Sequence, residues 1–310
     1  MRVAVVDIGS NSTRLLVAEV NQQTGSIEEL VRDSRVTRLG EGVDSSGALA
    51  AAAIDRVSNV LHDYHRAIAE HDCSANLAVL TSAVRDAENG ADFAKRVREE
   101  FELDARVLSG DEEAQLTFLG AMSTRPKDSA DMPTVVIDIG GGSTEFVVGH
   151  NRTAGFHVSL HVGVVRMSER HINSDPPRPD ELQKLAADVR SNFQVGLPED
   201  QRKAVQRAIA VAGTATSAAS IDQELDPYDP DRVNGYALTL GTVEMLLARL
   251  ADMDEAKRRQ VVGLHPDRAP TIVAGMIVLG EAMRAFGLDE VEVSEHDILY
   301  GGALRLAGVG

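Results

Sequence analysis

The sequence VVDIGSNSTRLLV at residues 5–17 recurs as VIDIGGGSTEFVV at residues 136–148. In each copy a run of β-branched residues leads into Asp-Ile-Gly, then small residues, then a second apolar run. This pattern predicts a β-hairpin whose tight turn contains glycine. With an offset of 131 residues, the aligned pairs are Asp7 and Asp138, Gly9 and Gly140, Ser12 and Ser143, and Thr13 and Thr144. The repeat indicates a chain built from two related halves.

Predicted strands and helices alternate along both halves. In the first half we expect strands at 3–8, 13–20, 26–32, 75–80 and 104–108, and helices at 48–70, 90–101 and 112–122. In the second half we expect strands at 134–139, 144–149, 155–161 and 207–212, a helix at 179–194, and mainly helices afterwards. This order is typical of an α/β protein. The polar, proline-containing segment STRPKDSADMP divides an N-terminal domain, 1–125, from a C-terminal domain, 126–310.

Composition restricts the classes of partner. The net charge of −17 argues against broad binding to nucleic acid or to an anionic membrane, although local arginines could still hold a phosphate. The single cysteine, Cys73, excludes an internal disulfide framework and a Cys-rich zinc site. The N-terminus lacks the apolar region of a signal peptide, and no apolar run is long enough to span a bilayer. We therefore expect a cytoplasmic protein.

The repeated turns have two interpretations, a plain glycine hairpin or a loop that holds phosphate. Glycine lets backbone N–H groups approach an anion, a Ser hydroxyl adds a donor, and the Asp at the strand end can hold Mg²⁺ or its waters. Two matched copies favour phosphate. Neither copy is a Walker loop, because neither has the GKS or GKT sequence, and neither is a GxGxxG turn that opens a helix.

A duplicated DxG hairpin resembles the actin, Hsp70 and sugar-kinase superfamily. More narrowly, the chain resembles the exopolyphosphatase/guanosine pentaphosphate phosphatase family. Six stretches carry that resemblance: DIGSNSTRLL at 7–16, TSAVRDAEN at 81–89, SGDEEAQLTFLG at 109–120, DIGGGSTEF at 138–146, VAGTATSAA at 211–219 and RAPTIVAG at 268–275. It implies two actin-like (ribonuclease H-like) domains with an interdomain cleft. The length matches family members that lack a C-terminal helical extension.

The resemblance also implies a chemistry, which is Mg²⁺-dependent hydrolysis of a terminal phosphoanhydride by a carboxylate-activated water. It assigns the carboxylate to Glu113, with Glu112 as the neighbouring alternative, and an arginine directed at the scissile phosphate to Arg85. Without the resemblance, the acidic pair would be read as interacting with a helix dipole. The implied phosphate contacts are Gly9, Asn11, Ser12, Gly140, Gly141, Gly142, Ser143, Gly213 and Thr214. The implied Mg²⁺ ligands are Asp138 and Glu145.

The two repeats differ in charge at one position, because Glu145 stands where the first copy has Arg14. We therefore expect the second half to hold metal while the first grips anion. The substrate is polyphosphate or, as the rival, guanosine pentaphosphate (pppGpp). An ATP-dependent kinase or ATPase and a non-enzymatic polyphosphate or alarmone sensor remain as alternatives. A homodimer is the expectation from the family.

Overall fold

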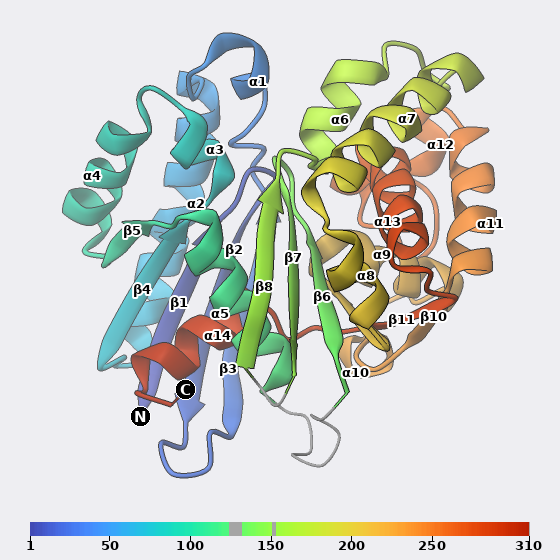
Figure 1. Ribbon diagram of the computed structural model, residues 1–310. Coiled ribbons are helices and arrows are strands. Elements are labelled where there is room, and N and C mark those ends of the chain that lie inside the picture. Colours follow the sequence, from blue (N-terminus) through green and yellow to red (C-terminus); the bar gives the residue numbers. More distant parts are fainter. Residues whose placement is uncertain (124–131, 151–152, 310) are drawn as a thin grey trace. The chain divides into compact units, whose positions relative to one another are not determined.

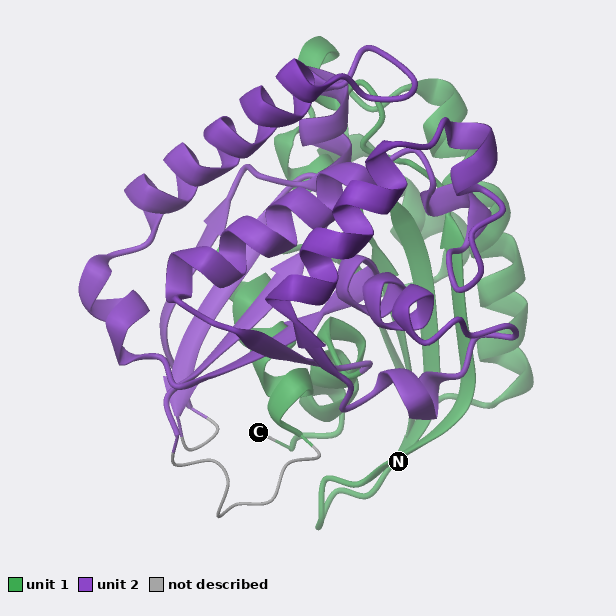
Figure 2. Ribbon diagram, turned by 90° about the vertical axis from the view of Figure 1, so that its right-hand side faces the viewer, with its two compact units in different colours: residues 1–125, 296–310 green, residues 126–295 purple. Residues whose placement is uncertain are grey.

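The computed structural model describes residues 1–123, 132–150 and 153–309. The chain forms two compact units (Figure 2): unit 1 contains Met1–Arg125 and His296–Gly310, and unit 2 contains Pro126–Glu295. By this division the segment 296–310, which the predicted boundary groups with 126–295, belongs to unit 1. That segment carries an apolar helix, and the sequence does not reveal which sheet the helix covers.

Unit 1 is built on a five-stranded sheet (Figure 1) in the order β3-β2-β1-β4-β5. Its strands are β1 (Arg2–Ile8), β2 (Ser12–Val20), β3 (Ile27–Val36), β4 (Ala75–Leu80) and β5 (Ala105–Val107). Strands β1, β2 and β3 pair antiparallel, whereas β4 and β5 run parallel to β1. Its helices are α1 (Val43–Ser46), α2 (Ala51–Glu70), α3 (Ser82–Asp86), α4 (Gly90–Phe101), α5 (Gly110–Met122) and α14 (Ile298–Leu306).

Both faces of the first sheet are apolar, because successive strand residues point to opposite faces. On one face Val6 and Leu15 pack in a core with Leu61 of α2. On the other face Val5 packs in a core with Leu299 of α14. Burying both faces explains why β1 and β2 read as nearly continuous hydrophobic runs.

Unit 2 repeats this arrangement with β8-β7-β6-β9-β11 and adds β10 at the edge (Figure 1). Its strands are β6 (Thr134–Ile139), β7 (Thr144–His150), β8 (Thr153–Leu160), β9 (Arg207–Val211), β10 (Ala237–Thr239) and β11 (Glu290–Val293). Its helices are α6 (Val164–His171), α7 (Pro179–Gly196), α8 (Glu199–Ala204), α9 (Ala212–Asp222), α10 (Pro230–Val233), α11 (Leu240–Ala251), α12 (Glu255–Arg258), the 3₁₀ turn η2 (Pro266–Arg268) and α13 (Ile272–Phe286). Ile137 and Phe146 share a core with Phe193 of α7.

The predicted fold class is confirmed. Each unit has three antiparallel strands followed by two parallel ones, which is the actin-like, ribonuclease H-like order. Helices dominate the chain after β9, as expected, but two strands that were not predicted, β10 and β11, complete the second sheet. Both strands are very short, and the alternating Glu-Val-Glu-Val of β11 gives little signal in a window of normal length. Among the described residues, no helix is both long and apolar enough to cross a bilayer.

Candidate functional site

The predicted site residues follow the carboxyl ends of parallel strands, where α/β sheets bind ligands. In unit 1 Ile8 of β1 pairs with Leu80 of β4, and Leu80 pairs with Val107 of β5. The first loop and the helices α3 and α5 therefore all follow the same end of the sheet, the carboxyl end of its parallel strands. Arg85 lies on α3 and Glu113 lies on α5. In unit 2 the second loop and the Gly213 turn follow β6 and β9, whose ends pair at Asp138 and Val211.

The first loop is a tight turn in which Gly9 N donates to Ser12 O at 3.0 Å. Its carbonyl groups are occupied, because Gly40 N donates to Ser10 O and Thr37 N to Asn11 O. No described residue accepts a hydrogen bond from the backbone N–H of Ser10 or Asn11. Buried N–H groups without a protein partner are rare, so this turn presents donors suited to an anion.

The second loop has the same hydrogen bond, from Gly140 N to Ser143 O at 3.0 Å. The start of α6 takes its carbonyl groups, with Val164 N donating to Gly140 O and Val165 N to Gly141 O. Arg166 Nε also donates to Gly142 O at 2.9 Å. Within the described chain, the backbone N–H groups of Gly141 and Gly142 have no acceptor. Both loops therefore present their N–H groups in the same way.

Gly213 and Thr214 lie in the first turn of α9, which begins directly after β9, and their surroundings differ from those of the two loops. A Cβ on Gly213 would lie 1.7 Å from Arg268 Nη1, so the guanidinium of Arg268 packs against this backbone. Thr214 is buried, and its side chain packs against Gly275 of α13. The Arg268 guanidinium therefore lies at the carboxyl end of strand β9, and only glycine at position 213 leaves room for it.

The half-buried Arg85 and the buried Glu113 form an ion pair in unit 1. Arg85 Nη1 donates to Glu113 Oε2 at 2.9 Å and to Leu108 O at 3.0 Å. The Nε and Nη2 groups of Arg85 donate to no acceptor in the described residues. Ser82, also on α3, shares a hydrogen bond of 2.9 Å with Ser10 of the first loop. The pair therefore lies on elements that adjoin the predicted phosphate loop.

The neighbouring Glu112 has a different environment. It caps α5: its Oε2 accepts from Ser109 N at 2.9 Å, and Glu112 N donates to Ser109 Oγ. The hydrogen bonds that the Glu112 carboxylate accepts from Ser109 N and Ser109 Oγ lower its pKa. Glu112 is exposed, whereas Glu113 is buried. The geometry therefore favours Glu113 over Glu112 as the carboxylate with a chemical role.

The two hairpins differ in charge at one register position. In unit 1 Asp7 lies opposite Arg14, which also contacts Asp297 at the start of α14. In unit 2 Asp138 lies opposite Glu145, whose Oε1 accepts from Ser159 Oγ at 2.6 Å. Side chains at opposed positions of an antiparallel pair share one face of the sheet. The second hairpin thus carries a buried glutamate at the register position where the first hairpin carries an arginine.

Sequence reasoning missed Asp297. The only signal was an Asp before an apolar run, which is typical of a helix N-cap. Asp297 does cap α14, since its Oδ1 accepts from Leu299 N at 3.1 Å. Its contact with Arg14 joins residues 283 positions apart, and no local pattern could reveal that pairing.

The described side chains offer few ligands for a metal ion. Among the described residues, no group of three or more His, Cys, Asp or Glu side chains could hold a metal ion. Mg²⁺ keeps several waters and is commonly bound through one or two carboxylates, so the Asp138 and Glu145 pair fits this ion. That fit rests on ligand chemistry.

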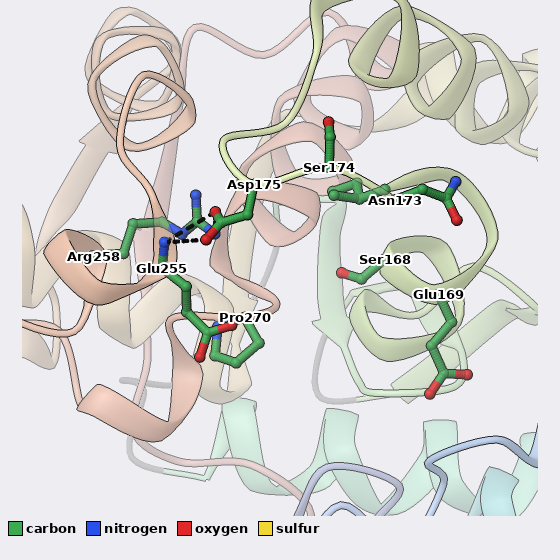
Figure 3. A pocket seen from close by; sticks show the side chains of 9 residues that line it. Ser168, Glu169, Asn173, Ser174, Asp175, Glu255, Arg258 and Pro270 are labelled. Atoms are coloured by element: carbon green, nitrogen blue, oxygen red, sulfur yellow. Dashed lines mark hydrogen bonds and ion pairs between the residues drawn. The ribbon is translucent and has the colours of Figure 1, made fainter.

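A pocket of about 340 Å³ lies elsewhere in unit 2 (Figure 3). Its lining contains none of the predicted site residues, and carries the carboxylates of Glu169, Asp175 and Glu255 against one guanidinium, that of Arg258. Arg258 Nη2 contacts Asp175 Oδ1 at 3.1 Å, and Asp175 also accepts from Glu255 N. An excess of negative charge makes this pocket a poor site for an anion.

Comparison with known proteins gives consistent matches over the whole chain. A model of the Ppx/GppA phosphatase family matches residues 16–305. Exopolyphosphatase 2 of Mycobacterium tuberculosis is 35% identical over 318 residues, covering 99% of each chain. The crystal structure of an exopolyphosphatase-like protein superposes with a TM-score of 0.93 at 31% identity, covering 98% of this chain and 97% of that one. A structure of the Aquifex aeolicus Ppx/GppA enzyme superposes with a TM-score of 0.80 at 28% identity, covering 99% of each chain.

Proposed function

This chain belongs to the Ppx/GppA phosphatase family, and on that basis we propose that it is an exopolyphosphatase. It would hydrolyse the terminal phosphoanhydride of inorganic polyphosphate and release orthophosphate. The relatives named exopolyphosphatases support this choice of substrate. The observation that carries the chemistry is the ion pair between half-buried Arg85 and buried Glu113, on elements adjoining a loop with unpaired N–H groups.

Glu113 is the proposed general base. It accepts a proton from water as the water oxygen attacks the terminal phosphorus. The anhydride P–O bond breaks, and the shortened chain leaves with the bonding electron pair. Hydrolytic phosphoryl transfer requires such a water-orienting group together with precise positioning. Arg85 holds the Glu113 carboxylate at 2.9 Å, so the base is oriented before substrate arrives.

Arg85 and the two loops are the proposed phosphate contacts. Arg85 commits one nitrogen to protein acceptors, and its Nε and Nη2 can donate to phosphate oxygens in the bidentate manner typical of arginine. The N–H groups of Asn11, Gly141 and Gly142, and the hydroxyls of Ser12 and Ser143, add neutral donors. Donors fixed by the fold stabilise the charge of the transition state without reorganising during the reaction.

Asp138 and Glu145 are the proposed ligands of Mg²⁺. The bound ion would neutralise charge on phosphate oxygens, which is its usual contribution to phosphoryl transfer. Ser159 donates to Glu145 and fixes the orientation of its carboxylate. Asp138 is the last residue but one of β6, directly before the loop. Both carboxylates therefore lie at the end of the sheet where the loop donors lie.

The decisive experiment compares kcat/KM for orthophosphate release from long polyphosphate, short polyphosphate and pppGpp, with Mg²⁺ and with EDTA. We expect polyphosphate to give the highest value and EDTA to abolish release. A higher kcat/KM on pppGpp would assign the rival activity. Retained binding of polyphosphate with no release would instead support the sensor, and phosphate transfer from ATP to an acceptor would support a kinase.

A further inference from the structure

Thr81 carries a hydroxyl that neither the fold nor the proposed reaction uses. The residue directly follows strand β4, is 5% exposed, and is the N-cap of α3. A threonine at an N-cap normally accepts a hydrogen bond from the first turn of its helix. Here the side chain accepts no such bond, and no described residue exchanges a hydrogen bond with the Thr81 hydroxyl. Buried hydroxyls are usually hydrogen-bonded, so this one is available to a ligand.

Strand geometry places the Thr81 side chain on the face of the first sheet that α5 covers. Val79 packs in a core with Leu116 of α5, whereas Leu80 packs in the core under α2 on the other face. The backbone of Thr81 is extended, with φ −110° and ψ −149°, and its N–H donates to Ile8 O, so the strand pattern continues through it. Side chains alternate between the faces of a sheet, and Thr81 therefore shares the face of Val79.

Three parts of the proposed site adjoin this position. Arg85 N donates to Thr81 O at 3.0 Å, and side chains four residues apart lie on one side of a helix. Arg85 in turn pairs with Glu113 on α5. Strand β4 lies between β1, which leads into the first loop, and β5, after which Leu108 O accepts from Arg85. Thr81 therefore lies at the end of the strand between the first loop and the Arg85–Glu113 pair.

Position separates Thr81 from two other buried hydroxyls that lack a partner in the described chain. Those of Ser58 and Ser220 lie within helices α2 and α9, each more than one turn from the start of its helix. Thr81 instead follows the carboxyl end of a parallel strand, which is where α/β sheets bind ligands. The same missing hydrogen bond thus has a functional explanation at Thr81.

We propose that the Thr81 hydroxyl is a further substrate contact, which donates a hydrogen bond to an oxygen of the terminal phosphoryl group. This inference rests on the proposed function, and it adds a neutral donor between the first loop and Arg85. A hydroxyl held at a strand end needs little reorganisation to make this bond, so it stabilises charge that develops in the transition state. The stability lost by leaving the hydroxyl unpaired in the free protein is offset when substrate binds.

The test compares Thr81→Val, which removes the hydroxyl and keeps the volume and the branched Cβ, with Thr81→Ser, which keeps the hydroxyl. We expect Thr81→Val to lower kcat/KM for orthophosphate release from polyphosphate by about 10–10²-fold, the size of one hydrogen bond to a charged group. Its Tm should equal or exceed that of the native chain, because no protein hydrogen bond is lost. Thr81→Ser should stay close to the native kcat/KM.

Ser58→Ala is the matched control, because it removes another unpaired buried hydroxyl from the same unit. It should leave kcat/KM unchanged and should not lower Tm. A Thr81→Val chain with native kcat/KM overturns the inference. A lowered Tm in that variant also overturns it, since the hydroxyl would then have a partner in the protein. Equal losses of kcat/KM in Thr81→Val and Thr81→Ser overturn it as well.

Binding of orthophosphate, measured by calorimetry, separates this inference from the proposed function. If the native chain releases no orthophosphate from polyphosphate, the proposed function fails while the contact at Thr81 is still tested. A Kd for orthophosphate raised about tenfold in Thr81→Val supports the contact. A Kd equal to that of the native chain, or a native chain that binds no orthophosphate, refutes it.

Discussion

The two hairpins share a backbone and differ in their charges. In both, a glycine N–H closes the turn onto a serine carbonyl, and the segment after the third strand occupies the loop carbonyl groups. The first hairpin then pairs Asp7 with Arg14, whereas the second places Asp138 opposite Glu145. A duplicated scaffold can therefore supply the same anion-binding donors twice while its side chains take separate roles. In our account unit 1 supplies the base and unit 2 supplies the metal ligands.

The largest expected effect comes from removing the base in unit 1. Glu113→Gln should lower kcat for polyphosphate hydrolysis by about 10²–10⁴-fold, the usual contribution of a general base. Mg²⁺ affinity should not change, because the metal ligands lie in the other unit. Glu112→Gln is the matched control and should keep turnover. Normal turnover in Glu113→Gln would refute the assignment.

A smaller effect is expected from disturbing the packing between α5, which carries Glu113, and α14, which Asp297 caps. A Cβ on Gly120 would lie 1.8 Å from the backbone oxygen of Asp297, so the helices would have to separate. Gly120→Ala should lower the free energy of unfolding by about 1–3 kcal/mol, measured by urea denaturation.

The matched control for that variant is in unit 2. A Cβ on Gly280 of α13 would have the flexible end of Arg284 as its nearest neighbour, at 3.3 Å. Alanine favours a helix over glycine, so Gly280→Ala should leave stability equal or slightly higher. Equal losses in the two variants would contradict the claim that the loss at Gly120 comes from its close contact with the other helix.

The smallest effect concerns the cap of α5. Ser109→Ala should cost about 1 kcal/mol of stability, because it removes the acceptor for Glu112 N. The folded pKa of Glu112 lies below its ordinary 4.5. The stability that the ionised Glu112 contributes is therefore present above pH 4.5 and is lost as pH falls through the lowered pKa. The free energy of unfolding of Glu112→Gln, measured by urea denaturation, should differ from that of the native chain at neutral pH and match it in strong acid. A difference that persists in acid would contradict the stabilising role of the ionised Glu112.

Much of the fold could be predicted because its signals are local. The repeated DIG hairpins and the apolar runs of β1 and β6 gave both sheet centres, and α2 and α4 follow from regular helical periodicity. The short strands β10 and β11 were missed because runs of three or four residues are too short to separate a strand from a chance pattern. The return of α14 to unit 1 depends on packing between distant segments.

The candidate site was predictable in part for the same reason. Glu112 and Glu113 are adjacent in sequence, and the only local sequence signal that distinguishes them is the capping box that Ser109 forms with Glu112. Arg85 reads as a surface charge until the fold brings it against Glu113. Arg268 and Asp297 could not be placed, because their contacts with Gly213 and Arg14 join segments far apart in the chain.

The division of roles between the hairpins is tested most directly by Mg²⁺ titration calorimetry of Glu145→Gln against the native chain. Substituting a direct ligand should weaken Mg²⁺ binding by about tenfold or more. The control Glu112→Gln, an equally conservative change in unit 1, should bind Mg²⁺ like the native chain. A Glu145→Gln chain with native Mg²⁺ affinity would contradict the account, since the second hairpin would then not be the metal site.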